Sequence, residues 1–426
     1  MTKVDQFKLS NGLPVILVEM PEVPSVAIGF MTKVGQRDGG MEKKEISHVL
    51  EHLVFDGTDK LPDRTEIAVA IDEIGGEFGG ETYEEYSYYF IKCEPKAFSR
   101  AAFILGEIIV HPLLSAKELE KEKIIIAQEL NLREDDPLIK IIDELQETVF
   151  PNHPLGCSRA EAVKSLPKMS REDLLAHWQK NYRTGSSVLV VCGDLPKIGK
   201  VKDLAEEYFA ELGKGERELL EKVGPETKGM TKVIDKKTSQ IHFALGGRAY
   251  PLSDPKVYAA RLMDIIFGHI ASSRLFLEIR EERKLAYAVF SNIDFYQDTG
   301  VFSVYAGVDK NRLEEAIQAV MAEMTKIVAD KEKGITDREL KKAKNFLSGR
   351  LAVQMDDPAN QVAFYAKRFL FEKEVITPEE LVARYQKVGR EELVAIAKDL
   401  FKPEKINLVV MGEGIEKEKV EKIFGY

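Results

Sequence analysis

Residues 118–137 read ELEKEKIIIAQELNLREDDP, and residues 339–358 read ELKKAKNFLSGRLAVQMDDP. The two segments align without gaps at an offset of 221 residues, and eight of the twenty positions are identical. In both copies a hydroxyl residue, Ser115 or Thr336, stands three positions before the first Glu, which is the capping-box spacing that starts a helix. The repeat therefore predicts two copies of one domain, each with a long helix at this place.

The length of the chain agrees with two domains. A chain of 426 residues is too long for one ordinary hydrophobic core, since domains of roughly 100 to 200 residues are the norm. After Leu212 the sequence becomes polar and rich in helix and strand breakers. We predict a first domain over residues 1–212, a linker over residues 213–230 and a second, homologous domain over residues 231–426.

Local patterns in the first half predict both strands and helices. The strand-like stretches are 13–18, 25–34, 86–93 and 187–192, and the helical stretches are 46–55, 64–74, 96–109 and 116–133. Such a mixture is typical of an α+β domain. For each domain we expect a largely antiparallel sheet with helices packed on one face.

Charge and cysteine usage exclude several classes of protein. The net charge of -10 arises from interspersed acidic and basic residues, which gives no support to nucleic-acid binding. No apolar run reaches the roughly 18 residues of a membrane helix, and the N-terminus has no signal-peptide pattern. Cys93, Cys157 and Cys192 form no CxxC pair, which argues against a disulfide framework and a cysteine zinc site. We expect a cytoplasmic protein without a membrane or nucleic-acid partner.

The segment His48-Val49-Leu50-Glu51-His52 carries two histidines four residues apart. On a helix both imidazoles project from one face, about one turn apart, where two ring nitrogens can reach one ion. Glu51 shares that face because it lies three residues after His48. A carboxylate beside two zinc ligands is the natural general base for a metal-activated water, so we assign Glu51 that role.

Catalytic zinc takes three protein ligands and leaves one position open, so one ligand must come from elsewhere in the chain. We assign it to Glu129, which lies 77 residues after His52 on the helix of the repeat. Glu122 lies seven residues earlier on nearly the same face and could hold a ligand in place. In the second copy Arg350 and Ala343 replace these two acids, so that copy has lost the site.

A plainer interpretation of these residues stays open: a helix that carries two histidines without a metal. Glu129 alone is weak evidence, because a Glu in a Lys- and Glu-rich helix is usually solvated. Its weight comes from its spacing and from its loss in the second copy. By a looser alignment, the counterparts of His48, Glu51 and His52 are Ala260, Met263 and Asp264. We assign the metal as Zn²⁺, one per chain, although such ligands also accept cobalt or manganese.

These motifs resemble the pitrilysin/insulinase family of zinc peptidases, the inverzincins, in which HxxEH is followed by a distal Glu at this separation. The resemblance extends over nearly the whole chain. It includes residues 8–13, 48–58, 118–137, 153–156, 272–276 and 285–287. It implies that each half is an α+β domain and that two such two-domain units close, in a clamshell arrangement, around a chamber that admits peptides and excludes folded proteins.

The resemblance repeats the roles given above to His48, His52, Glu129, Glu51 and Glu122, and it adds two residues of the second copy. Arg280 and Tyr287, seven residues apart, are implied to reach the substrate carbonyl near the metal. A guanidinium and a phenol can donate hydrogen bonds to the oxyanion that develops when water attacks. The metal motif is then half of a bipartite active site.

The resemblance also implies that substrate backbone pairs with an exposed strand edge beside the active site. Members often carry an Asn-Ala pair there, whereas residues 75–82 of this chain read GGEFGGET. Glycines permit close backbone approach, so we retain strand addition by a peptide as an expectation. The expected substrate-binding residues are Gly79, Gly80, Glu81 and Thr82.

The leading hypothesis is a zinc metallopeptidase that cleaves short, unfolded peptides. The alternative is a noncatalytic core or partner subunit of the same fold in a larger assembly, and the intact HxxEH with Glu129 argues against it. A third hypothesis is a heteromer in which the metal and the Arg/Tyr pair lie on separate chains. Because both constellations occur in this one chain, we expect a homodimer.

Overall fold

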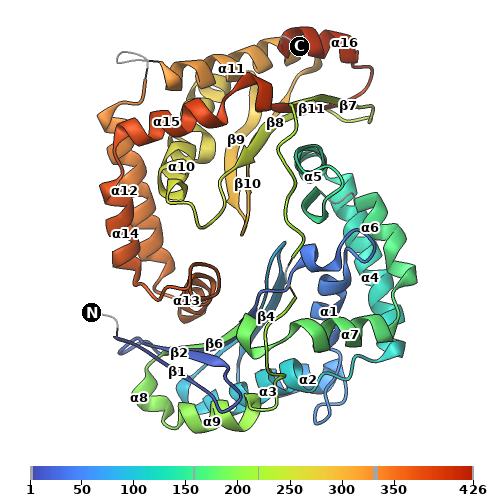
Figure 1. Ribbon diagram of the computed structural model, residues 1–426, viewed down its shortest axis with the longest axis vertical. Coiled ribbons are helices and arrows are strands. Elements are labelled where there is room, and N and C mark those ends of the chain that lie inside the picture. The colour runs from blue at the N-terminus through green and yellow to red at the C-terminus, as the bar shows by residue number, and fades with distance from the viewer. Residues whose placement is uncertain (1–2, 157–158, 219, 330–333, 425–426) are drawn as a thin grey trace. The chain divides into compact units, whose positions relative to one another are not determined.

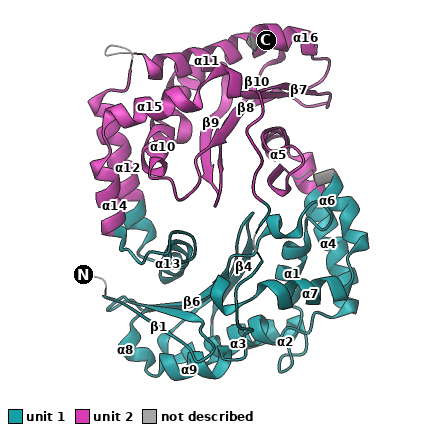
Figure 2. Cartoon of the chain, in the orientation of Figure 1, with its two compact units in different colours: residues 1–130, 160–221, 351–378 teal, residues 131–159, 222–350, 379–426 magenta. Residues whose placement is uncertain are grey.

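The structure is a computed structural model that describes residues 3–156, 159–218, 220–329 and 334–424 (Figure 1). The chain divides into two units, which Figure 2 distinguishes by colour. The first unit consists of Met1–Leu130, Ala160–Glu221 and Leu351–Pro378, and the second of Asn131–Arg159, Lys222–Arg350 and Glu379–Tyr426. The chain passes from Glu221 to Lys222 inside the predicted linker, 213–230. Each unit also includes a segment from the other half of the sequence, residues 351–378 in the first unit and 131–159 in the second. Each of these segments contributes one helix that packs on the sheet of its unit.

Six strands form the sheet of the first unit in the order β1-β2-β6-β3-β5-β4. They are β1 (Lys3–Lys8), β2 (Pro14–Glu19), β3 (Val26–Thr32), β4 (Glu77–Thr82), β5 (Ser87–Cys93) and β6 (Ser187–Gly193). β2 and β6 run parallel, and the other neighbouring pairs run antiparallel. β3 and β6 are buried along their whole length, which fits their nearly continuous apolar sequences. β4 lies at the edge of the sheet and is partly exposed.

The helices of the first unit pack on this sheet or on one another. They are α1 (Ile46–Val54), α2 (Arg64–Asp72), α3 (Phe98–Val110), α4 (Ala116–Asp135), α6 (Arg159–Ser165), α7 (Arg171–Asn181), α8 (Leu195–Ile198), α9 (Val201–Phe209) and α13 (Pro358–Glu372). α3 packs against β3 and β5 and carries α9 on its outer side. The first residues of α1, α2 and α4 are those predicted from the sequence, and α3 begins two residues later than predicted.

The second unit repeats this plan with a sheet in the order β7-β11-β8-β10-β9. Its strands are β7 (Thr231–Ile234), β8 (Ile241–Ala249), β9 (Ala286–Phe295), β10 (Gly300–Val308) and β11 (Asn407–Met411). β7 and β11 run parallel, and the remaining pairs run antiparallel. Its helices are α5 (Pro137–Val149), α10 (Lys256–Asp264), α11 (Leu313–Val328), α12 (Asp337–Gln354), α14 (Pro378–Lys387), α15 (Arg390–Leu400) and α16 (Lys417–Phe424). Two π-helical segments, Ile265–His269 and Phe276–Glu282, precede β9.

A single helix from the other half of the chain covers the second face of each sheet. In the first unit, Val362 and Tyr365 of α13 pack against β3 and β6. Gly29 of β3 makes this packing close, since a Cβ atom there would lie 2.5 Å from Val362 Cγ1. In the second unit, Ile141 and Leu145 of α5 pack against β8 and β11. Figure 2 shows α5 in the colour of the second unit. The expected layer of helices on one face is therefore joined by one further helix on the other face.

Both exchanged helices begin at the Asp-Asp-Pro end of the repeated segment. The side chain of Asp136 accepts hydrogen bonds from the backbone N–H groups of Leu138 and Ile139 at the start of α5. Asp357 accepts the corresponding bond from Ala359 at the start of α13. Proline tolerates the first helical position because the N–H that it lacks would have no partner there. The repeat thus ends one helix and caps the next in both halves.

The predicted α+β class and the two related domains are confirmed. Within the described part of the chain, no helix combines the length and the apolar character required to cross a membrane.

Candidate metal centre

The helix α1 presents both histidines of the HxxEH motif because its opposite face is anchored in the core. Its apolar residues Ile46, Val49, Leu50 and Leu53 are all buried. This spacing of three and four residues is the apolar stripe of a helix that packs on one side. The histidines are left on the other side, partly exposed, with their rings 4.9 Å apart.

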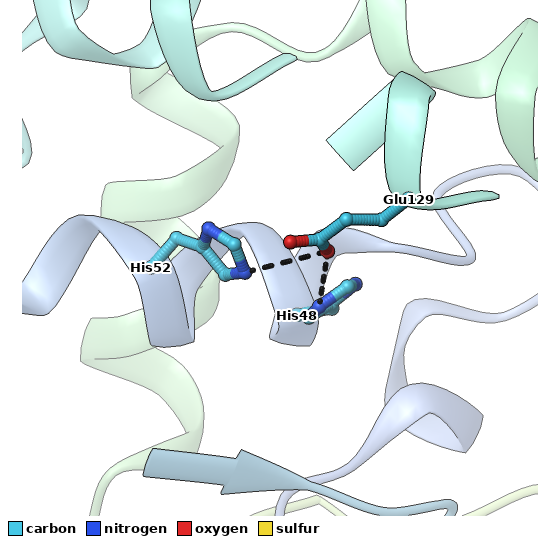
Figure 3. Close-up of side chains that lie close together, drawn as sticks. All are labelled: His48, His52 and Glu129. Carbon is cyan, nitrogen blue, oxygen red and sulfur yellow. Dashed lines mark ion pairs between the residues drawn. The ribbon is translucent and has the colours of Figure 1, made fainter. Parts of the chain in front are cut away.

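The predicted third ligand approaches both imidazoles. Figure 3 shows Glu129 reaching from another helix, α4, so that its carboxylate lies between the rings of His48 and His52. Its Oε2 atom lies 3.6 Å from Nε2 of His48 and 3.8 Å from Nε2 of His52. Ligand atoms of all three residues lie within 4.8 Å of one another. The structure therefore brings together residues that are 77 positions apart in the sequence.

The remaining nitrogen of each imidazole contacts a buried carboxylate. His52 Nδ1 lies 2.6 Å from Glu122 Oε2, as expected for a residue that supports a ligand. His48 Nδ1 lies 2.9 Å from Glu45 Oε2, a contact that the sequence did not predict. A ring that donates from Nδ1 keeps the lone pair of Nε2 for a metal. This donor set, two imidazole nitrogens and one carboxylate, fits Zn²⁺ with an open position.

A cation supports Glu122 from the other side. Nη2 of Arg64 lies 2.7 Å from Glu122 Oε1, and its Nε lies 2.6 Å from Asp56 Oδ1. Burial alone would raise the pKa of Glu122, but the hydrogen bond with His52 and the charge of Arg64 lower it below its ordinary value. Glu122 is therefore held as an anion beside His52.

The same contact acts on the imidazole. Burial would lower the pKa of His52, but the hydrogen bond to Glu122 and the negative charges of Glu122, Glu51 and Glu129 raise it above the ordinary value. The surroundings of His52 thus favour a positive charge at this point. A divalent cation satisfies the same preference.

Glu51 lies against the edge strand of the sheet. A Cβ atom built on Gly80 would stand 3.0 Å from Glu51 Oε1 and 2.9 Å from Cε2 of Phe55. Gly80 therefore allows the backbone of β4 to approach the proposed base. The four predicted substrate-binding residues, Gly79, Gly80, Glu81 and Thr82, all lie in this strand.

Arg280 and Tyr287 contact each other in the second unit. The guanidinium carbon of Arg280 lies 4.9 Å from the centre of the Tyr287 ring and 4.7 Å from that of Phe276. Arg280 belongs to a π-helical segment, and Tyr287 lies at the start of the edge strand β9 with 76% of its surface exposed. Packing in the hydrophobic core does not explain why these two residue types stand here, because both side chains are partly or largely exposed to solvent. Their role toward the metal centre, which belongs to the first unit, stays a prediction.

A buried polar network behind α1 was not predicted. Ser47 Oγ donates to the carbonyl of Gly35 and lies 3.0 Å from Nε2 of His177 on α7. Nδ1 of His177 lies 3.1 Å from Nδ2 of Asn181. Burial and the charges of Lys180 and Lys43 lower the pKa of His177 to about 4. The neutral ring therefore accepts from Asn181 and donates to Ser47, which ties α1 to α7.

Comparison with known proteins identifies the family of the chain. The family model described as Insulinase (Peptidase family M16) matches residues 14–162, and the model described as Peptidase M16 inactive domain matches residues 168–347. An uncharacterized zinc protease of Rickettsia felis is 33% identical, and the match covers 92% of this chain and 94% of the relative. The chain belongs to peptidase family M16. A second relative, YmxG of Bacillus subtilis, is also named an uncharacterized zinc protease and is 28% identical, with 93% of this chain and 96% of YmxG covered.

Solved structures share the M16 fold of this chain. A protease from Helicobacter pylori aligns with a TM-score of 0.88 at 22% identity, covering 97% of this chain and all of that one. An M16 inactive domain from Pseudomonas fluorescens aligns with a TM-score of 0.88 at 21% identity, covering 97% of this chain and 99% of that one. These structures support the fold assignment alone.

The second copy of the M16 domain has a different interior where the first has its histidines. Ala260 and Met263 are buried in the core cluster of the second unit. Asp264 is also buried and accepts a hydrogen bond of 2.5 Å from Ser291 Oγ. Among the residues that the structure describes, His48, His52 and Glu129 form the one group of this kind that could hold a metal. The loss of the site from the second copy follows from these replacements.

Proposed function

We propose that this M16 chain is a zinc-dependent peptidase that hydrolyses short, unfolded peptides. One observation carries the proposal: the Nε2 atoms of His48 and His52 converge on the carboxylate of Glu129, while each Nδ1 atom contacts another carboxylate. This orientation of both rings is not expected for two histidines that happen to lie on one helix without a common ligand. The names of the relatives as zinc proteases support the same function.

The three ligands would hold one Zn²⁺ per chain, and the zinc, when bound, would polarise the scissile carbonyl and lower the pKa of water. Glu51 takes the proton from the attacking water and later delivers it to the leaving amine. Its place on the same helix as both histidines keeps this carboxylate beside the reaction. Glu122 and Arg64 hold His52 in its orientation through the contacts described above.

The edge strand β4 binds the substrate backbone in this proposal. An edge strand has free N–H and C=O groups along one side, and an extended peptide can pair with them. The lack of room for a side chain between Gly80 and Glu51 supports pairing at this place, because a peptide bound along β4 would pass close to the base. Only an extended, unfolded segment can add to a strand edge, which supports short peptides as substrates.

Arg280 and Tyr287 complete the site by donating hydrogen bonds to the developing oxyanion. Their mutual contact and the exposed position of Tyr287 support this assignment. Both constellations occur in one chain, so a homodimer needs no second type of subunit. An intact metal site also disfavours a noncatalytic subunit.

The buried free thiols of Cys93 and Cys192 agree with a reducing compartment, and we propose the cytoplasm. Cys157 lies outside the described residues.

The test is cleavage of a mixture of short, internally quenched peptides before and after metal removal. Chelation should abolish hydrolysis, and one equivalent of zinc per chain should restore it. His48→Ala should bind no zinc and stay inactive after zinc is added. Hydrolysis that is indifferent to chelation would show that the chain is not a metallopeptidase.

A further inference from the structure

Glu45 stands at the start of α1, where a side chain usually caps the helix. Its backbone carbonyl accepts the first helical hydrogen bond, from Val49 N–H at 2.8 Å. Its carboxylate caps no backbone N–H group of α1. Instead, Oε2 lies 2.9 Å from Nδ1 of His48, and the side chain is almost completely buried. A buried carboxylate directed at one imidazole calls for an explanation other than helix capping.

The contact repeats, from a different part of the chain, the arrangement around His52. Glu122 contacts His52 from another helix, α4. Glu45 contacts His48 from the position just before α1, the helix that carries His48. In both cases the carboxylate takes Nδ1, and Nε2 is the nitrogen nearest to Glu129. Glu45 therefore lies on the opposite side of the His48 ring from Glu129. From this position its carboxylate cannot bind the same metal ion as Nε2 of His48.

We propose that Glu45 is a positioning residue that fixes the tautomer and the orientation of His48 for metal binding. The inference rests on the proposed function, since it treats His48 as a ligand. A carboxylate that accepts from Nδ1–H keeps the proton on that nitrogen and leaves the Nε2 lone pair for the metal. Burial strengthens this hydrogen bond, because little water competes for either group.

The test compares Glu45→Ala and Glu45→Gln with a matched control, Glu42→Ala. Glu42 belongs to the same loop but is exposed. Zinc affinity is measured by competition with a chromophoric chelator. Loss of a carboxylate behind a ligating histidine typically weakens metal binding by about 10-fold to 100-fold, and we expect this range for Glu45→Ala. Glu45→Gln keeps an acceptor oxygen and should recover part of the affinity, and Glu42→Ala should match the parent protein.

A second measurement reports on His48 without any metal. In the zinc-free protein labelled with ¹⁵N-histidine, the ring nitrogen shifts of His48 should identify the Nδ1–H tautomer. Glu45→Ala should move His48 toward a mixture of tautomers, while Glu42→Ala should not. Far-UV circular dichroism checks that each variant is folded, and Glu45→Gln serves if the alanine variant does not fold.

An unchanged zinc affinity together with an unchanged tautomer of His48 in a folded Glu45 variant would overturn the inference. This outcome differs from failure of the proposed function, in which the parent protein itself would bind no zinc. At saturating zinc the Glu45→Ala protein should regain most of its kcat, because a positioning residue acts through the ligand. If kcat at saturating zinc stayed as low as in a variant that lacks the general base, Glu51→Gln, Glu45 would take part in the reaction itself. That result would also overturn the inference.

Discussion

The carboxylate of Glu51 and the backbone of Gly80 are so close that a Cβ atom on Gly80 would stand 3.0 Å from Glu51 Oε1. Cβ atoms rarely approach other heavy atoms this closely, so a side chain at position 80 would displace the carboxylate or the neighbouring ring of Phe55. The glycine therefore helps to determine where the base lies. This role can be tested by a single methyl group.

Gly80→Ala should lower kcat while leaving zinc content unchanged. A displacement of a catalytic group by about 1 Å can cost roughly 100-fold in rate, and the smaller displacement that a methyl group requires here should cost about 10-fold or less. The matched control is Gly349→Ala in α12, where a Cβ atom would meet nothing within 4 Å. Steady-state kinetics with metal analysis checks both variants. A Gly80→Ala enzyme with normal kcat would remove this contact from the mechanism.

Glu51→Gln should bind zinc normally and lose most of its turnover. An amide has nearly the size of a carboxylate but cannot accept the proton, and general-base catalysis typically contributes about 10²-fold to 10⁴-fold. The measurement is kcat beside metal stoichiometry. Glu66→Gln in α2, a substitution at an exposed glutamate, is the control. Normal hydrolysis by the Glu51→Gln protein would show that the base lies elsewhere.

Tyr287→Phe should lower kcat without lowering thermal stability. The phenylalanine ring keeps the contact with Arg280 but loses the hydroxyl, and one lost oxyanion donor typically costs about 10²-fold to 10³-fold. Tyr287 is largely exposed, so its hydroxyl contributes little to folding. Tyr208→Phe in α9, also in a ring contact, provides a comparison. An unchanged kcat for Tyr287→Phe would contradict the bipartite active site.

The sequence predicted that His48, His52 and Glu129 lie close together, and it could do so because most of the information is local. His48, Glu51 and His52 share one face of α1 through their spacing alone, and no tertiary contact is needed to see this. Glu129 required the repeat as well, since a single Glu in α4 carries no signal of its own. The difference between the two copies supplied that signal.

Other features depend on tertiary contacts that the sequence pattern does not encode. Glu45 resembles an ordinary polar residue before a helix, and only the orientation of its carboxylate toward His48 reveals a further role. The exchange of α5 and α13 was also missed. Asp136 and Asp357 mark the start of a helix in the sequence, but such a local motif does not predict which sheet the helix packs on.

His177 offers a test of how α1 is supported, because its neutral ring links Ser47 to Asn181. The folded-state pKa of about 4 lies below the ordinary value of 6.5. Between these values the unfolded chain binds a proton that the folded chain does not bind. The stability that this ring contributes is therefore complete above pH 6.5 and is lost as the pH falls toward 4.

His177→Gln should remove this component of the acid sensitivity. The full shift corresponds to roughly 3 kcal/mol, with a slope of at most about 1.4 kcal/mol per pH unit. Urea unfolding of the zinc-free protein between pH 7 and pH 4 should show a shallower decline in the free energy of unfolding for the variant, even if the variant is less stable at pH 7. Because Ser47 precedes His48, the lost hydrogen bond should also loosen the start of α1 and weaken zinc binding at neutral pH. Parallel pH dependences of the two proteins would mean that His177 has the same pKa in the folded and the unfolded chain, and the acid sensitivity assigned to its buried ring would then be wrong.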